Sequence, residues 1–214
     1  MQLRSWDSHY SQETTLQAFA ASLIYHWPYI WQICLKAKHS AIEIGCGRGV
    51  HSIFLSCFIP NVLGIDNNIK LVEKARKNNS KFHGHARFSI RDAFKLDFAP
   101  GTFDVCFSQG FLEHFSDEEI RLLAEKQLRI AKVMVASVPS ALYAVRDRGD
   151  ERLMRIEDWQ QILKDFDMRI FSYGFRPREI NRIISVKNLV EITKIVSSMS
   201  GKAHVCMVVK KATN

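Results

Sequence analysis

Glycines at positions 45, 47 and 49 have the spacing of a turn that binds a nucleotide-like ligand. They follow a short apolar segment, Ala41–Ile44, which contains the acidic residue Glu43. Glycine has no Cβ, so the backbone of such a turn can lie against a ligand, and the following helix directs free N–H groups toward it. A dinucleotide fingerprint needs a third small residue where this chain has Val50. The turn therefore predicts a nucleotide-like cofactor other than NAD or FAD.

Two aspartates occur where later strands are expected to end. Asp66 follows an apolar segment, and a carboxylate at this point can accept both hydrogen bonds of a ribose diol. The alternative is a helix N-cap, a task that Asn67 or Asn68 would share. Asp92 and Ala93 follow the next apolar segment, where an aspartate taken alone is ordinary turn chemistry.

The segment Phe103–Phe115 runs as a strand into Ser108-Gln109-Gly110 and then into Leu112-Glu113-His114. Together with the glycine turn, it resembles the motifs of class I S-adenosylmethionine (SAM) dependent methyltransferases of the small-molecule type. The resemblance implies that Asp92 and Ala93 contact adenine and that the loop after the strand contacts the methionine part of SAM. It also implies that Glu43 orders the glycine turn and reaches the cofactor, or serves only as a brace of the turn. The expected cofactor contacts are Glu43, Gly45, Cys46, Gly47, Gly49, Asp66, Asn67, Asp92, Ala93, Ser108, Gln109 and Gly110.

His114 and Tyr10 are the candidate catalytic residues. An oxygen or nitrogen acceptor must lose a proton, and the pKa of histidine, ordinarily about 6.5, suits that transfer. His114 could equally only shape the methionine pocket. Tyr10 lies where related enzymes fold a lid over SAM, and the charged segment 143–152 is a second lid candidate, although solvated ion pairs would give the same pattern. No cluster of histidines and carboxylates has metal-ligand spacing, so we expect no metal.

The alternation of strand-like and helix-like segments predicts an α/β fold that positions these residues at the carboxyl edge of a sheet. We expect a Rossmann-like three-layer sandwich whose seven-stranded, mostly parallel sheet ends in an antiparallel strand, with N-terminal helices and a helical insertion before the last strand. The expected strands are Ala41–Ile44, Asn61–Ile65, Ala86–Ile90, Phe103–Ser108, Val133–Val138, Met168–Tyr173 and Ala203–Val209. The expected helices are Val50–Phe58, Lys70–Asn78, Asp117–Ile130, Ile156–Leu163 and the insertion Glu179–Val196.

The length of 214 residues and a hydrophobic share of 47% suit one methyltransferase domain over residues 1–214. Within it we expect an N-terminal helical cap over 1–39, a cofactor-binding core over 40–140, and a substrate-side loop, inserted helix and closing strands over 141–214. The formal net charge is +8. The basic residues between Lys70 and Arg91 predict either a nucleic-acid patch or, as we expect, a solvated helix face and its exit loop.

The stretch between Glu13 and Lys36 carries no charged residue and is long enough in principle to span a bilayer. His26 and Pro28 interrupt it, which favours two short helices whose aromatic residues, Tyr25, Trp27, Tyr29 and Trp31, pack on the main domain. Five scattered cysteines without CxxC pairing are typical of buried, reduced thiols. We therefore expect a cytoplasmic protein without membrane association. The resemblance implies an enzyme with SAM as cofactor and a small-molecule acceptor. RNA or protein methylation, or SAM binding without catalysis, are the alternatives, and the oligomeric state stays open.

Overall fold

The computed structural model describes every residue except 1–4, 144–145, 147, 175–202 and 213–214. Its helices are α1 (Trp6–His9), α2 (Leu16–Tyr25), α3 (Trp27–Cys34), α4 (Val50–Leu55), α5 (Ile69–Lys81), α6 (Asp117–Ile130) and α7 (Ile156–Ile162), with a 3-10 turn η1 at Leu112–His114. Its strands are β1 (Ser40–Ile44), β2 (Asn61–Asp66), β3 (Arg87–Ile90), β4 (Phe103–Gln109), β5 (Ala131–Pro139), β6 (Phe166–Tyr173) and β7 (His204–Lys211). The expected helix Glu179–Val196 lies outside the described residues.

The strands form one seven-stranded sheet in the order β3-β2-β1-β4-β5-β7-β6. Strands β1 to β5 pair in parallel, and β7 is antiparallel to both β5 and β6. The predicted Rossmann-like sheet is therefore confirmed. The order in which successive strands are added to the sheet reverses between β1 and β4, and the loops that leave these two neighbouring parallel strands lead to opposite faces, which opens a crevice at their carboxyl ends.

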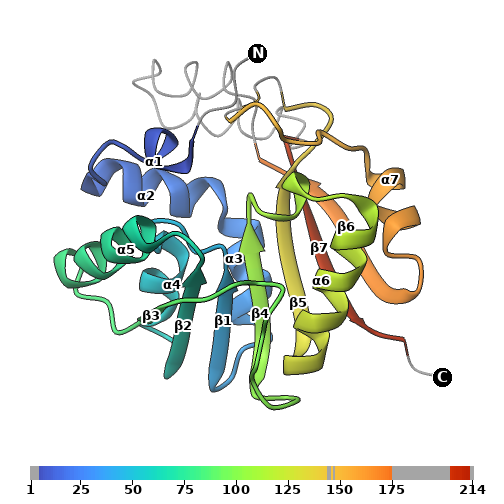
Figure 1. Ribbon diagram of the computed structural model, residues 1–214, viewed down its shortest axis with the longest axis horizontal. Helices are drawn as coiled ribbons and strands as arrows, with labels where there is room; N and C mark the ends of the chain where they lie inside the picture. The colour runs from blue at the N-terminus through green and yellow to red at the C-terminus, as the bar shows by residue number, and fades with distance from the viewer. Residues whose placement is uncertain (1–4, 144–145, 147, 175–202, 213–214) are drawn as a thin grey trace, which may run out of the picture.

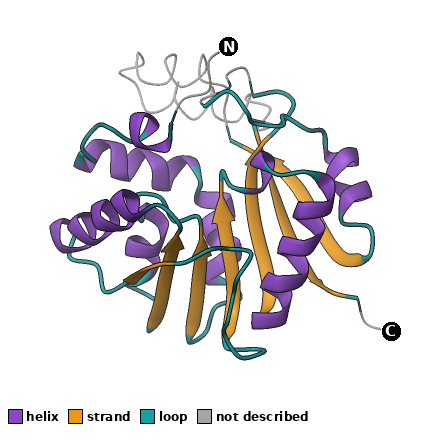
Figure 2. Cartoon of the chain, viewed as in Figure 1, coloured by secondary structure: helices purple, strands orange, loops and turns teal. Residues whose placement is uncertain are grey.

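Helices cover both faces of the sheet (Figures 1 and 2). Residues of α2, α3, α4 and α5 share one apolar cluster with Val133 and Val135 of β5. Residues of α6 and α7 share another with Met134 and Ala136. Because side chains alternate between the faces of a strand, β5 contributes to both clusters, and a three-layer sandwich results.

The N-terminal helices correct one sequence prediction. Tyr29, Ile30 and Ile33 of α3 are fully buried against the sheet, whereas Trp27 and Trp31 are 46% and 49% exposed. With 3.6 residues per turn, a short helix can turn only one side to the sheet, so these two tryptophans lie on its outer side. The prediction that the aromatic residues pack on the main domain therefore holds for Tyr29, whereas Trp27 meets Phe54 of α4 but stays half exposed, as does Trp31. Among the described residues, no helix has the length and apolar character required to cross a bilayer.

Candidate functional site

The glycine turn follows β1 and leads into α4 through three residues in the left-handed region. Gly45 has φ +66°, and a Cβ placed there would lie 2.6 Å from the Phe111 ring. Gly49 has φ +77° and serves as the N-cap of α4, where a Cβ would lie 2.7 Å from the Phe88 ring. Both the backbone conformation and the close packing therefore require glycine at these two positions.

Glu43 stabilises this turn through hydrogen bonds to α4, the helix that follows it. Its carboxylate accepts the backbone N–H of Ser52 at 3.1 Å and the Ser52 hydroxyl at 2.5 Å, and lies 3.4 Å from Nδ1 of His51. The side chain is 3% exposed and is directed at the first turn of α4. Of the two interpretations offered by the sequence, these contacts correspond to the brace.

Asp66 at the end of β2 is fixed by two backbone groups. Its Oδ2 accepts the N–H of Gly47 at 3.0 Å, and its Oδ1 accepts the N–H of Asn68 at 2.9 Å. Burial raises the pKa of Asp66, while these two hydrogen bonds lower it. The helix N-cap that follows is Asn68, whose side chain accepts the N–H groups of Lys70 and Leu71. Asn68 therefore fills the N-cap role, and the Asp66 carboxylate is held toward the glycine turn.

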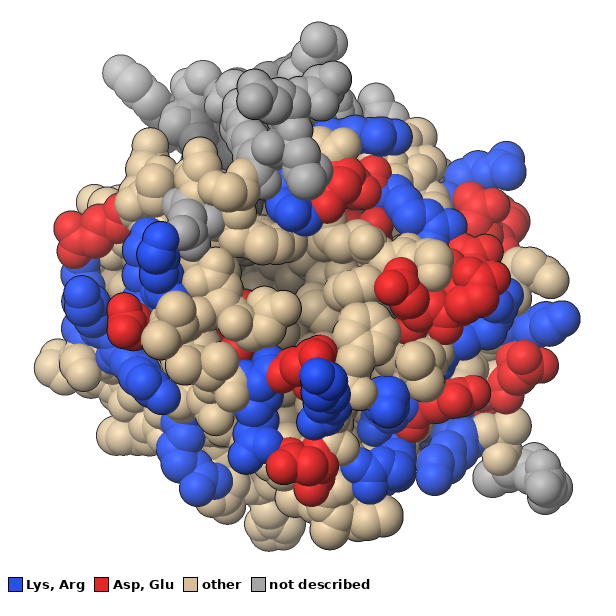
Figure 3. Space-filling model, viewed as in Figure 1, with Lys and Arg blue, Asp and Glu red and all other residues tan. Residues whose placement is uncertain are grey.

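A cavity of about 260 Å³ lies at the carboxyl edge of β1, β2 and β4, and Figure 3 shows a hollow near the middle of this face of the molecule. Many of the residues predicted from the sequence line it: Tyr10, Gly45, Gly47, Asp66, Asn67, Asp92, Ala93, Gly110 and His114. The predicted contacts Glu43, Cys46, Gly49, Ser108 and Gln109 do not belong to this lining. Cys46 is buried beneath the turn, and its N–H donates to Ile65.

Strand β4 explains why Ser108 and Gln109 are missing from the lining. The strand was expected to end at Ser108, but it continues through Gln109, because these two residues pair with Ala136 and Ser137 of β5. Ser108 is therefore 1% exposed inside the sheet. Gly110, whose N–H donates to Ser137 at 2.9 Å, is the first residue that turns into the cavity.

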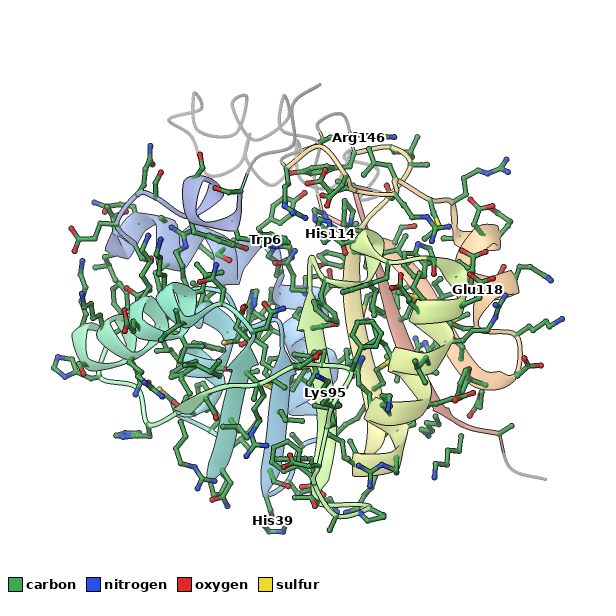
Figure 4. All side chains as sticks on the ribbon, in the orientation of Figure 1. Trp6, His39, Lys95, His114, Glu118 and Arg146 are labelled. Atoms are coloured by element: carbon green, nitrogen blue, oxygen red, sulfur yellow. The ribbon has the colours of Figure 1, made fainter. Side chains whose placement is uncertain are left out.

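The other end of the cavity is covered by aromatic and charged side chains from three segments. The Trp6 ring stacks on Tyr10 at 6.1 Å and meets His114 edge-on at 5.0 Å between ring centroids. The Arg148 guanidinium lies over the Trp6 ring, 4.3 Å from its centroid. Figure 4 labels Trp6 and His114 above the carboxyl edge of the sheet. Both predicted lid segments thus contribute residues to one cover.

His114 is held by a carboxylate that sequence reasoning did not single out. Its Nδ1 lies 2.9 Å from Oδ1 of Asp150, which also pairs with Arg148. Burial lowers the pKa of His114, and the Asp150 carboxylate opposes that shift. The charge alternation in segment 143–152 was the only signal for Asp150 and Arg148, because no spacing in the sequence relates that segment to His114.

Glu151 completes a group of possible metal ligands that the sequence did not predict. Ligand atoms of His114, Asp150 and Glu151 lie within 4.8 Å of one another. Glu151, however, accepts the N–H groups of Arg148 at 2.6 Å and of Gly149 at 2.9 Å, and the Arg148 guanidinium pairs with Asp150. Protein donors and an adjacent cation already satisfy these carboxylates, which disfavours a cation there.

The comparison with known families decides between the cofactors that such a turn could bind. A family model described as a methyltransferase domain matches residues 41–133, from β1 to the start of β5. Over this segment the chain is similar to the class I SAM-dependent methyltransferases. The cofactor that this similarity implies is SAM.

Individual relatives of the methyltransferase act on different kinds of acceptor. Protein-L-isoaspartate O-methyltransferase of Rhodopseudomonas palustris (strain BisB5) is 26% identical over 121 residues, which are 56% of this chain and 56% of the relative. Probable tRNA methyltransferase 9B of Bos taurus is 28% identical over 144 residues, 66% of this chain and 30% of the relative. The chain thus spans about half the length, or less, of these curated relatives.

One solved structure was determined with ligands bound. Haemonchus contortus phosphoethanolamine N-methyltransferase 2, in complex with phosphomonomethylethanolamine and S-adenosylhomocysteine, aligns with a TM-score of 0.63 and 15% identity, and covers 99% of this chain and 61% of that chain. This similarity supports the fold of the methyltransferase. By their names, the three relatives modify a protein, a tRNA and a small molecule.

Proposed function

We propose that this methyltransferase transfers a methyl group from SAM to a small-molecule acceptor and releases S-adenosylhomocysteine. The main support for the proposal is that one cavity is lined both by the glycine turn and Asp66 and by Trp6, His114 and Asp150. One end offers groups that suit a nucleoside. The other end offers a histidine paired with a carboxylate, beneath a cover of aromatic rings.

The first end of the cavity fits the nucleoside part of SAM. Each carboxylate oxygen of Asp66 accepts one backbone N–H and retains a second lone pair for a ribose hydroxyl. Ile65, Leu71 and Phe94 supply apolar walls for a flat ring, beside Asp92 and Ala93. Bound SAM supplies the electrophilic methyl carbon and its sulfur leaving group.

His114 is the group that we propose removes the acceptor proton. When Asp150 accepts the Nδ1–H of His114, the lone pair of the ring lies on Nε2, which is the tautomer that a general base requires. Because burial lowers the pKa of His114, the ring is neutral and competent as a base near pH 7. Trp6 meets the His114 ring edge-on at 5.0 Å between centroids and limits the access of water. Alignment of the acceptor with the methyl group, in a site that excludes water, contributes the remainder of the rate acceleration.

The cover of the cavity is our reason for preferring a small acceptor. The Trp6 ring lies 5.0 Å from the His114 ring and 4.3 Å from the Arg148 guanidinium, so we expect an acceptor to reach His114 past these side chains. A folded protein or an RNA helix is too wide for that path. The basic residues of α5 favour RNA as the alternative acceptor, and a SAM-binding protein without catalysis is a further alternative.

Cofactor binding tests the first half of the proposal. We expect S-adenosylhomocysteine to bind in isothermal titration, and Asp66→Ala to raise its Kd roughly 100-fold or more, since two hydrogen bonds to a charged acceptor contribute about 1.5–3 kcal/mol each. Asp165→Ala is the matched control, because that carboxylate is exposed and outside the cavity. Binding of NAD without binding of S-adenosylhomocysteine would show that the proposal is wrong.

Acceptor screening tests the second half. The protein is incubated with SAM and a metabolite extract, and mass spectrometry detects products heavier by one methylene group. We expect such a product, and we expect it to disappear with His114→Ala while cofactor binding persists. Transfer to bulk RNA or protein alone would replace the small-molecule assignment. Cofactor binding without any transfer would support the non-catalytic alternative.

A further inference from the structure

Four aromatic side chains form a surface that the cofactor site does not use. Trp27 lies 6.2 Å from Trp31 and 6.3 Å from Phe54, and Phe54 lies 5.1 Å from Phe58, between ring centroids. Trp27, Trp31 and Phe58 are 46%, 49% and 67% exposed. We call these four residues the aromatic patch. In Figure 1 its helices, α3 and α4, lie on the face of the sheet away from α6.

The row of exposed apolar residues extends beyond the patch. Ile24, near the end of α2, is 75% exposed. Along α3 and its C-cap, Trp27, Trp31 and Leu35 follow one another at intervals of four, and Leu35 is 56% exposed. Residues at these intervals lie on one side of a helix. An outer helix side of a water-soluble domain is ordinarily polar, and contiguous apolar surface on it indicates an interaction site.

The segment that carries the aromatic patch contains cations and one buried carboxylate. Between Glu13 and Asp66 the sequence contains a single carboxylate, Glu43, which is 3% exposed and bound to Ser52. Lys36 and Lys38 follow α3 directly. The Lys36 ammonium lies 3.5 Å from the Gln32 side chain, one residue beyond Trp31. The elements that carry the patch therefore border it with cations and present no exposed carboxylate.

We propose that the aromatic patch docks the methyltransferase on the surface of an anionic phospholipid bilayer. Tryptophan and phenylalanine rings insert at the level of the lipid headgroups, and Lys36 and Lys38 contact the anionic headgroups. The eight residues of α3 extend over about 12 Å, against a hydrocarbon core of about 30 Å, so the helix lies along the surface. A symmetric contact between two copies would instead bring equal cationic borders together, which like charges disfavour.

Vesicle sedimentation tests the docking. The probes are vesicles of phosphatidylcholine alone and of phosphatidylcholine mixed with phosphatidylglycerol. We expect the full chain to sediment with the mixed vesicles, and its tryptophan emission to shift to shorter wavelength. The Trp31→Gln/Phe58→Gln double variant should bind at least roughly tenfold more weakly, because two rings no longer leave water. Leu122→Gln is the matched control, since Leu122 is 42% exposed on α6, which packs on the opposite face.

A lysine variant tests the electrostatic part independently. Lys36→Gln/Lys38→Gln keeps every ring in place and should weaken binding to the mixed vesicles by about fivefold for each lysine, with a smaller dependence on salt. Titration with S-adenosylhomocysteine verifies that each variant is folded. The proposal is overturned if the full chain does not sediment with the mixed vesicles, or if the double variant binds as well as Leu122→Gln. A dimer in analytical ultracentrifugation that the double variant abolishes, without vesicle binding, would assign the patch to a second copy.

Discussion

Replacement of Gly49 by alanine tests how closely the glycine turn is packed on the sheet. A Cβ at Gly49 would lie 2.7 and 2.8 Å from two atoms of the Phe88 ring and 3.0 Å from the Cβ of Ala75. All three distances are far below ordinary contact, and Phe88 is only 7% exposed, so its ring cannot move into solvent. The added methyl group must therefore displace the turn or the ring.

The magnitude follows from two contributions. Alanine in the left-handed region costs about 1–2 kcal/mol relative to glycine, and an extra methyl group in a packed core costs about 1–3 kcal/mol. Gly101 isolates the first contribution, because it has φ +69° and nothing within 4 Å of its added Cβ. We expect Gly101→Ala to lower the free energy of unfolding by about 1–2 kcal/mol and Gly49→Ala by about 2–5 kcal/mol.

Urea denaturation of the two variants measures this difference, and a third substitution identifies its source. Phe88→Leu removes the outer ring atoms that would meet the new methyl group. In that background, Gly49→Ala should cost nearly as little as Gly101→Ala, which gives a coupling energy of about 1 kcal/mol or more. Equal costs for the two glycine substitutions in the parent protein, or no coupling with Phe88→Leu, would refute the packing argument.

Three further predictions concern ionisable groups. Asp150→Asn removes the interactions that raise the pKa of His114, so the acidic limb of the kcat profile should move to lower pH, and an unmoved limb would exclude His114 as the base. Burial lowers the pKa of His204 to about 4 from its ordinary 6.5. As the pH falls from 6.5 to 4, His204 is protonated in the unfolded chain before it is protonated in the folded chain, so the free energy of unfolding decreases by about 3 kcal/mol. His204→Gln should remove this contribution to the pH dependence of the free energy of unfolding, measured by urea denaturation at several pH values. Burial raises the pKa of Tyr10 to about 12, so Tyr10→Phe should alter the rate but add or remove no limb of the profile below about pH 10.

The central strands and the residues at their carboxyl ends could be predicted from sequence because local signals specify them. An apolar segment that ends in glycines or in an aspartate marks both a strand and its end. Parallel strands then bring those ends to one edge, which is how Gly47, Asp66 and Asp92 come to line one cavity. The direction in which individual side chains point was harder to predict from the sequence than the strands themselves. Strand β4 continues one residue beyond its expected end, so Gln109 still pairs with β5 and Ser108 is an interior strand residue rather than the start of the loop.

The pairing of His114 with Asp150 could not be predicted, because it depends on how a long connection returns across the sheet. The two residues are 36 positions apart, and no periodicity links them. The return path is fixed by tertiary contacts: the N–H of Arg152 donates to the carbonyl of Glu113 at 2.9 Å, and the Arg152 guanidinium reaches the carbonyl of Phe115 at 2.6 Å. Charge alternation in the sequence marks such a loop without revealing its partners.

The two ends of the cavity are held in place by interactions of different strength. The cofactor end is built on strand ends that pair in register, and Asp66 receives two backbone hydrogen bonds there. The acceptor end is closed by side chains from α1, η1 and the loop at Arg148, joined through the Trp6 ring. Ring and cation contacts of this kind contribute about 1 kcal/mol each, much less than the packing that holds the sheet. If the proposed function is right, we expect the acceptor end to open for exchange while the cofactor end keeps its geometry. An acceptor that enters past Trp6 consequently meets a cofactor site that is already ordered.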